Sequence, residues 1–240
     1  MTDQQTTTTE AELLTKTRMV ALGEIAAGIA HEINNPLAIL KQCVYLIEDY
    51  IKRDQVTEVG RSRLVEKAIV TIDRIASLTK ALLIFSREEN RDTFVLGSVR
   101  RIVDEAIERQ ASLLSLTEVK VDGSAIPQDF EVECREQQLV EVLSNLIANA
   151  CDSVADTKGA VIEIEARTTA KGKEIIVRDN GTGIKPAIAA KIFDPFFSTK
   201  TIGHVGLGLS VVKELVRSLG GHIGFYSEPG KTEFIIEFPK

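Results

Sequence analysis

The chain has 240 residues, of which 44% are hydrophobic and 27% are charged, and its formal net charge at pH 7 is −6. This length allows two modest domains, and the composition is typical of a soluble globular protein. The acidic balance argues against nucleic acid as a general partner, because no excess of basic side chains can neutralise its phosphates, but it is compatible with a local nucleotide site.

The cysteines and the apolar runs bear on the cellular compartment. Cys43, Cys134 and Cys151 follow neither the spacing of a metal site nor that of a disulfide framework, which favours a reducing compartment and a cytoplasmic protein. No apolar run is long enough to span a bilayer and no secretory leader is present, so we expect no membrane segment in this chain. It is either a naturally short protein or the cytoplasmic portion of a longer one. Residues 1–10 are rich in Thr and Gln, which predicts a disordered N-terminus.

Residues 11–52 predict one long amphipathic helix, bent at Pro36. The positions of its apolar stripe recur at steps of three and four: Leu22, Ile25, Ile29, Ile33, Leu37, Leu40, Val44, Ile47 and Ile51. His31 projects almost opposite the middle of that stripe, towards water, with Glu32 and Asn35 beside it. An exposed imidazole next to a carboxylate and a carboxamide suits proton or group transfer, although a lone surface histidine often has no role.

A second helix follows a polar turn, with apolar positions at Leu64, Ala68, Ile72, Ile75, Leu78, Leu82 and Phe85. Residues 11–90 therefore predict a helical hairpin. Two such helices bury only half of each stripe in one another, so the remainder most simply pairs with a second copy and gives a dimeric four-helix bundle. The alternative is packing against the rest of the chain.

Residues 91–240 mix helical and strand patterns after a charged linker at 86–92. Helices are predicted at 99–114, 137–154 and 205–219. Strands are predicted at 119–121, 130–132, 161–166, 174–178, 223–226 and 233–238. Helices gathered on one face of a mixed sheet form an α/β sandwich, so the expected fold class is a helical hairpin followed by an α/β sandwich domain.

Two motifs in this second part place oxygen atoms where a ligand could use them. Asn145 and Asn149 are four residues apart on one helix face, and carboxamide oxygens suit Mg²⁺, although ordinary polar-face residues would look the same. Asp179 ends a predicted strand and is followed by Gly181 and Gly183, which puts a carboxylate beside closely approachable backbone. A bare Asp-x-Gly-x-Gly is also a common turn.

Two further motifs follow. The segment Ile192–Lys200 carries Phe193, Phe196 and Phe197, a cluster that an ordinary core would also show. Lys200 could reach a phosphate as a point charge, although a solvated loop lysine would look the same. The segment Gly206-Leu207-Gly208 opens a helix, where backbone N–H groups and the helix dipole favour negative charge.

Taken in order, these motifs resemble the conserved boxes of sensor histidine kinases of two-component systems. His31–Leu37 resembles the phosphoacceptor box, Asn145–Ala150 the N box, Asp179–Ile184 the first glycine box, Ile192–Lys200 the F box and Gly206–Ser210 the second glycine box. The resemblance covers about Arg18 to Pro239. It implies a Bergerat-type ATP-binding domain at 91–240, use of ATP and Mg²⁺, a homodimer formed through the hairpin, and a response regulator receiver domain as partner.

The resemblance also implies roles for single residues. At the hairpin, His31 would accept the phosphoryl group, Glu32 would act as base, and Asn35 would orient a water that dephosphorylates the regulator. In the second domain, Asn145 would orient the nucleotide phosphates and Asn149 would bind the magnesium ion. The remaining nucleotide-binding positions are Asp152, Asp179, which accepts a hydrogen bond from the adenine amino group, Gly181, Gly183, Lys200, Gly206, Leu207, Gly208 and Thr232.

The chain departs from the family pattern before Gly206, where His204-Val205 replace the usual Gly-Thr-Gly lead-in and the stretch after Lys200 is about one residue short. This departure keeps a second hypothesis open, a dimeric docking scaffold that binds ATP poorly or not at all. A third hypothesis is a Bergerat-type ATPase or serine kinase of the anti-sigma kind, but such proteins lack the long histidine-bearing hairpin.

Overall fold

A computed structural model describes residues 33–52, 58–86, 93–117, 119–199 and 206–240. The chain divides into two compact units, and each is described by itself: the helices of residues 33–52 and 58–86 belong to the first, and the chain from residue 93 to 198 and from 206 to 240 forms the second. The predicted boundary between residues 90 and 91 and the predicted disorder at 1–10 lie outside the described residues. No helix in the described part of the chain is long and apolar enough to cross a membrane.

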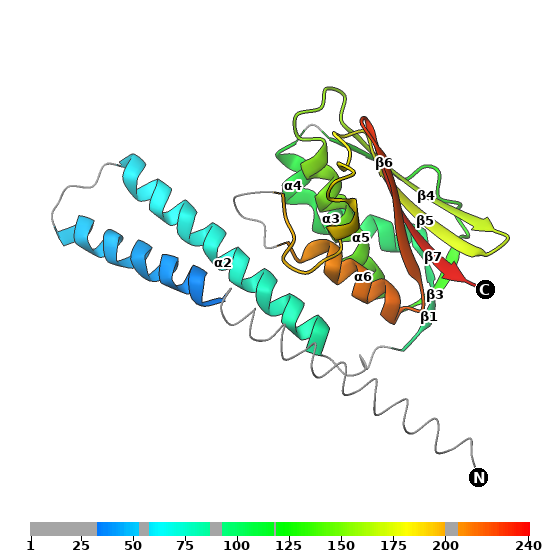
Figure 1. The fold of residues 1–240 in the computed structure, drawn as a ribbon, viewed down its shortest axis with the longest axis horizontal. Helices are drawn as coiled ribbons and strands as arrows, with labels where there is room; N and C mark the ends of the chain where they lie inside the picture. Colours follow the sequence, from blue (N-terminus) through cyan, green and yellow to red (C-terminus); the bar gives the residue numbers. More distant parts are fainter. Residues whose placement is uncertain (1–32, 53–57, 87–92, 118, 200–205) are drawn as a thin grey trace, which may run out of the picture. The chain divides into compact units, whose positions relative to one another are not determined.

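The first unit is a helical hairpin (Figure 1). Residues 33–52 are helical throughout, Pro36 included, and α2 spans Glu58–Ser86. Cys43, Thr71 and Leu78 are buried, and the Thr71 hydroxyl donates to the Lys67 carbonyl at 2.6 Å instead of facing water. Each helix nevertheless exposes large apolar side chains, among them Leu37, Val44, Ile51, Val65, Ile69 and Ile72.

The second unit is a five-stranded mixed sheet with helices on one face (Figure 1). The strand order is β2 (Lys120–Asp122), β4 (Val161–Thr169), β5 (Gly172–Asp179), β7 (Lys231–Pro239) and β6 (His222–Glu228). Only the β2–β4 pair is parallel. The covering helices are α3 (Val99–Arg109), α5 (Glu136–Ser153) and α6 (Gly208–Ser218). The predicted α/β sandwich after a helical hairpin is confirmed.

The core lies between the sheet and these helices because the strands alternate. Ile162, Ile164, Ile175, Val177 and Ile236 point to the covered face and are almost fully buried. Apolar side chains of α5, such as Leu143, Leu146 and Ile147, meet them there with no exposed surface. This packing fixes the rotation of α5, and therefore which of its polar residues face outward.

The open face of the sheet carries charges instead. Arg178 of β5 forms an ion pair with Glu163 of β4 at 2.8 Å and with Glu233 of β7 at 2.6 Å. The hydrogen bonds that Arg178 donates to these carboxylates raise its pKa, so the guanidinium stays charged. This ladder lets the open face stand in water without an apolar cover.

The structure differs from the sequence prediction in two places. The helix predicted at 99–114 is two helices, because the chain turns at Gln110 (φ −97°, ψ 8°) between α3 and α4 (Ala111–Ser115). The strand predicted at 130–132 is β3 (Glu131–Cys134), which does not join the main sheet. It pairs with β1 (Val95–Ser98), a short strand that the sequence analysis did not predict.

Candidate functional site

The candidate site lies along a stripe of polar side chains on α5. Glu141, Asn145, Asn149 and Ser153 are each four residues apart, so they share one face of the helix. The apolar side chains of α5 occupy the other faces and hold the helix against the sheet. The neighbours of these four side chains lie in α3, α6 and β5.

One end of the stripe meets the last residue of β5, Asp179. Asp179 is only 4% exposed as a residue, and its Oδ1 accepts hydrogen bonds from the Ser153 hydroxyl at 3.0 Å and from the Gly181 N–H at 2.9 Å. Thr232 lies opposite Asp179 in the β5–β7 register, is buried, and has its hydroxyl 3.0 Å from that of Ser227. These groups form a buried polar cluster, which we call the carboxylate end.

Burial raises the pKa of Asp179, while the hydrogen bonds from Gly181 and Ser153 act in the opposite direction. The net direction is upward, because the charged form loses water that two donors do not fully replace. A buried carboxylate with a perturbed pKa at the end of a strand is typical of a site that binds a hydrogen-bond donor.

Residue 181 must be a glycine because Ser153 and Asp179 approach its backbone closely. A Cβ atom on Gly181 would lie 2.1 Å from the Ser153 hydroxyl oxygen and 2.7 Å from Asp179 Oδ1, so any side chain would separate these two groups. Gly183, two residues on, stands against the backbone oxygen of Glu228, 2.6 Å from where its own Cβ would be.

The other end of the stripe meets the start of α6, and we call it the carboxamide end. Asn145 donates from Nδ2 to the Glu141 carbonyl at 2.9 Å and to Glu141 Oε1 at 3.0 Å. A Cβ on Gly208, the first residue of α6, would lie 3.4 Å from Asn145 Oδ1 and 3.8 Å from Asn149 Nδ2. Asn149 Nδ2 is buried and has no hydrogen-bond partner in the described part of the chain.

Glu141 is itself held by α3. Its Oε2 lies 3.8 Å from Arg109 Nη1, and the same guanidinium donates to Glu105 at 2.8 Å and to Gln137 at 2.5 Å. The Asn145 carboxamide is therefore oriented through Glu141 by a charged network that extends to α3.

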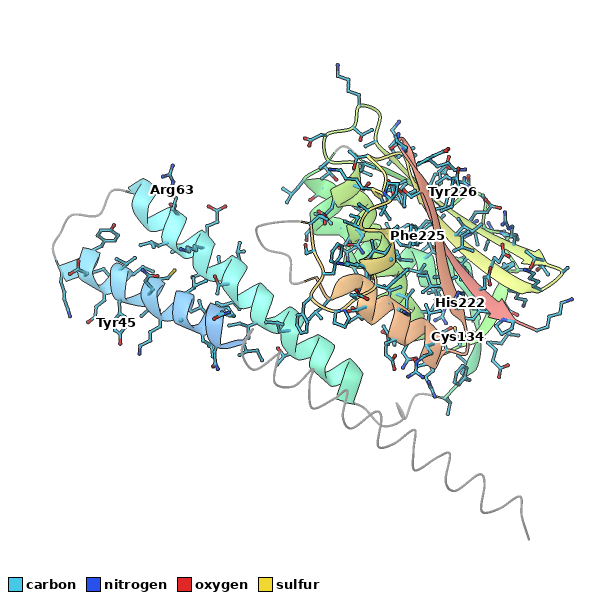
Figure 2. The ribbon with its side chains drawn as sticks, in the orientation of Figure 1. Tyr45, Arg63, Cys134, His222, Phe225 and Tyr226 are labelled. Atoms are coloured by element: carbon cyan, nitrogen blue, oxygen red, sulfur yellow. The ribbon has the colours of Figure 1, made fainter. Side chains whose placement is uncertain are left out.

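The phenylalanine-rich segment and the glycine-rich start of α6 contact each other. Gly206 has φ +73°, and a Cβ there would lie 2.7 Å from the carbonyl carbons of Phe196 and Phe197, so only glycine fits. The Phe193 ring meets Phe225 of β6 edge-on at 6.0 Å (Phe225 is labelled in Figure 2). Leu207 is buried and caps α6 through its carbonyl. The segment is thus anchored beside the carboxamide end.

The structure places most of the predicted site residues in these two ends. Asn145, Asn149, Gly206, Leu207 and Gly208 gather at the carboxamide end; Asp179, Gly181, Gly183 and Thr232 gather at the carboxylate end. Asp152 is half-buried next to Ser153 on α5. Asn35 is exposed on the helix of residues 33–52 in the other unit. The predicted residues His31, Glu32 and Lys200 lie outside the described residues.

Sequence reasoning missed Ser153 and Glu141. The signal was available, because both lie four residues from an asparagine that was recognised, on the same helix face. Their partners in β5 and α3 could not be read from spacing alone.

Two family models match the chain. Residues 21–91 match the His Kinase A (phospho-acceptor) domain, and residues 134–240 match the histidine kinase-, DNA gyrase B- and HSP90-like ATPase domain. The two matched ranges contain the hairpin and both ends of the candidate site.

Several curated proteins are similar over most of the chain. The sensory histidine kinase/phosphatase NtrB of Rhizobium meliloti is 30% identical over 90% of this chain and 58% of its own length. The C4-dicarboxylate transport sensor protein DctB of Rhizobium meliloti is 28% identical over 96% of this chain and 37% of its own. This chain spans about a quarter to two fifths of the length of DctB, the sensor PprA and sporulation kinase A.

Among solved structures, the histidine kinase ThkA in complex with the response regulator protein TrrA has a TM-score of 0.72 at 23% identity, covering 97% of this chain and 66% of that one. A histidine kinase AdeS structure from Acinetobacter baumannii has a TM-score of 0.68 at 22% identity over 87% of this chain and 97% of that one. At these identities the likeness shows the fold.

Proposed function

We propose that this chain, which belongs to the sensor histidine kinases of two-component systems, is an ATP-dependent kinase that phosphorylates His31 and passes the phosphoryl group to an aspartate of a response regulator. The observation that carries the proposal is the α5 stripe, whose ends offer a buried carboxylate and two carboxamides beside a helix N-terminus. These are the groups that an adenine nucleotide needs at its base and at its phosphates.

The carboxylate end supplies base recognition in this proposal. Asp179 accepts a hydrogen bond from the adenine amino group, and Thr232 supports the same wall from β7. At the carboxamide end, Asn145 orients the phosphates, and the first N–H groups of α6 at Leu207 and Gly208 face their negative charge. Asp152 and Lys200 complete the nucleotide contacts.

The residues present fit a magnesium ion that is brought in with the nucleotide. The described residues contain no cluster of three or more His, Cys, Asp or Glu side chains able to hold a metal, so an all-protein cage is not expected there. Asn149 has a carboxamide whose nitrogen is buried without a partner among the described residues, so its orientation is not locked by the protein. Its oxygen would serve as the protein ligand, and the bound ion would neutralise phosphate charge.

The helical hairpin supplies the acceptor and the dimer contact. His31 attacks as neutral imidazole, and Glu32 takes the proton from the other ring nitrogen. Leu37, Val44 and Ile51 are exposed at seven-residue intervals, and Val65, Ile69 and Ile72 are exposed on α2. A second copy covering these residues would complete a four-helix bundle in the cytoplasm.

A regulator phosphatase activity is the second part of the proposal. Asn35 is exposed and lies four residues after His31 in the sequence, and its carboxamide would orient a water towards the phosphorylated aspartate. The relative NtrB carries both activities in its name. Asn35→Ala should abolish phosphatase activity on a phosphorylated regulator and leave autophosphorylation intact. Phosphatase activity that survives the substitution would remove this role.

The kinase proposal is tested by incubating the chain with γ-labelled Mg-ATP beside a His31→Gln variant. We expect an acid-labile, base-stable label on the wild type and none on the variant. Persistent label on His31→Gln would overturn the acceptor assignment. A chain that takes no label and binds no nucleotide would favour the docking scaffold, the hypothesis that the unusual His204-Val205 lead-in, which lies outside the described residues, keeps open.

A further inference from the structure

Ser153 of the α5 stripe has no role in the proposed reaction, yet it contacts the buried carboxylate of the site, Asp179. Its hydroxyl donates to Asp179 Oδ1 at 3.0 Å. Its backbone carbonyl accepts from the Thr182 N–H at 3.4 Å, which ties the end of α5 to the loop after β5. Gly181 leaves this approach open, since a Cβ there would fall 2.1 Å from the Ser153 hydroxyl oxygen.

The two donors on Asp179 meet at the same oxygen. Ser153 Oγ and Gly181 N both donate to Oδ1, at 3.0 and 2.9 Å, and a carboxylate oxygen has two lone pairs to offer. Oδ1 is therefore saturated, and Oδ2 accepts no hydrogen bond from the described residues. The two bonds also fix the rotation of the carboxylate, so Oδ2 presents its lone pairs in one direction.

The ionisation of Asp179 decides which base can bind. As a carboxylate, Asp179 only accepts hydrogen bonds, so it pairs with an amino group and repels a carbonyl. Once protonated, it can donate, and a base with a carbonyl in place of the adenine amino group becomes acceptable. Burial favours the protonated form, and the Ser153 and Gly181 hydrogen bonds oppose it.

We infer that Ser153 is a positioning residue that sets base specificity: its hydroxyl keeps Asp179 a pure hydrogen-bond acceptor with Oδ2 directed at the base. The inference rests on the proposed function, because it concerns the residue proposed to recognise adenine. It adds selection against bases with a carbonyl at the same position, such as hypoxanthine and guanine.

The other titratable groups around Asp179 do not replace Ser153. Across the sheet Asp179 lies opposite Ile162 of β4 and Thr232 of β7, neither of which titrates. On α5 the titratable neighbours of Ser153 are Asp152 and Cys151, and burial raises the pKa of Cys151.

The charged groups next along the strands face the other side of the sheet. Arg178 precedes Asp179 in β5, and it pairs there with Glu163 of β4 and Glu233 of β7. Beyond β7, the Glu228 backbone oxygen lies near Gly183, and the Glu228 carboxylate accepts from the Tyr226 hydroxyl at 2.9 Å.

The test compares ADP with IDP, which carries a carbonyl where ADP carries the amino group. Both nucleotides are titrated calorimetrically into the full chain, into Ser153→Ala and into Ser144→Ala, from about pH 8 to about pH 5. Ser144 is the matched control, because it is a buried serine on the same helix whose hydroxyl has no partner in the described part of the chain. Thermal unfolding checks that all three proteins are folded.

We expect Ser153→Ala to weaken ADP binding by about tenfold, since the carboxylate of Asp179 is no longer held by Ser153 with Oδ2 directed at the base. The ADP-to-IDP affinity ratio should fall as well, and it should begin to fall at a higher pH than in the wild type, because loss of the donor raises the pKa of Asp179 further. Ser144→Ala should match the wild type in both respects.

The remaining outcomes overturn the inference in distinguishable ways. If the wild type binds ADP and labels His31, but Ser153→Ala keeps the wild-type ratio and its pH profile, the inference fails and the proposed function stands. An equal loss in Ser144→Ala would assign the effect to α5 as a whole. A folded wild type that binds no ADP would remove both the proposed function and the inference.

Discussion

The two ends of the α5 stripe are built differently although they lie on one helix. At the carboxylate end, Asp179 Oδ1 receives two hydrogen bonds from the protein and Thr232 is paired with Ser227. At the carboxamide end, Asn149 Nδ2 is buried with no partner among the described residues. The protein therefore supplies the hydrogen bonds that orient the carboxylate end, whereas at the carboxamide end the described residues leave Asn149 Nδ2 without a partner. If the proposed function holds, the groups that recognise the base are preorganised, and those at the phosphates can adapt to what binds.

The largest effect is expected at the carboxamide end. Asn149→Ala should lower the rate of His31 phosphorylation by about a hundredfold or more, because the only proposed protein ligand of the magnesium ion is lost. The free energy of unfolding should hardly change, since the substitution also removes a buried nitrogen that has no partner in the described residues. Labelling with γ-labelled Mg-ATP and urea unfolding measure the two quantities.

The control for this prediction is ADP binding in the presence of a chelator. If the two ends are separable, metal-free ADP affinity stays within about twofold of the wild type, because base contacts dominate it. Equal loss of metal-free binding and of phosphorylation in Asn149→Ala would contradict the distinction between the ends.

Asp179→Asn should separate binding from stability at the carboxylate end. Adenine nucleotides should bind about tenfold to a hundredfold more weakly, because the charged acceptor becomes a neutral amide. The folded chain should become more stable at neutral pH. The folded pKa of Asp179 is raised by burial, so its contribution to stability is fully present only below its unfolded pKa and is lost as pH rises through the folded value.

The measurement is thermal unfolding without nucleotide, in parallel with ADP titration. The stability gain should shrink as pH falls towards the ordinary range of an aspartate, where both forms of residue 179 are neutral. A variant that is less stable at neutral pH would mean that the two hydrogen bonds on Oδ1 outweigh the cost of burial.

The sequence was sufficient for the parts of the site that depend on spacing along one element. Asn145 and Asn149 share a helix face by periodicity, and Asp179 ends a strand whose alternation is regular. It was not sufficient for contacts between elements. The bond between Ser153 and Asp179 depends on where the end of α5 lies against the end of β5, and β1 is held by its pairing with β3. Tertiary placement decides both, and no local pattern encodes it.

Gly181→Ala tests whether the close approach at the carboxylate end is needed. The added methyl group would lie 2.1 Å from the Ser153 hydroxyl oxygen and 2.5 Å from its carbonyl oxygen, so the end of α5 must shift. Overpacking of this kind costs about 1–3 kcal/mol of unfolding free energy. Chemical denaturation measures the loss, and ADP affinity should fall with it. Gly224→Ala is the matched control, because a Cβ on Gly224 of β6 would meet nothing within 4 Å.

The smallest effect is expected from Glu233, a carboxylate on the open face of the sheet. It follows Thr232, the residue that pairs with Asp179. Glu233 lies opposite Arg178, and Thr232 lies opposite Asp179. The side chains of Glu233 and Asp179 therefore point to opposite faces of the sheet. Burial alone would raise the pKa of Glu233, but the hydrogen bonds and charges of Arg178 and Lys231 outweigh it and leave the pKa below its ordinary value.

The contribution of Glu233 to the stability of the fold therefore changes with pH in the opposite direction to that of Asp179. A lowered folded pKa contributes stability above the unfolded pKa, and that contribution is lost as pH falls through the folded pKa. Glu233→Gln should cost about 0.5 kcal/mol at neutral pH, because the pair is partly exposed, and it should flatten the acid limb of the stability curve. ADP affinity should not change, since Glu233 and Arg178 face the side of the sheet opposite Asp179 and Thr232. A measurable loss of ADP affinity would mean that Arg178, released from Glu233, disturbs Asp179 through the strand, and the carboxylate end would then be less self-contained than its own hydrogen bonds indicate.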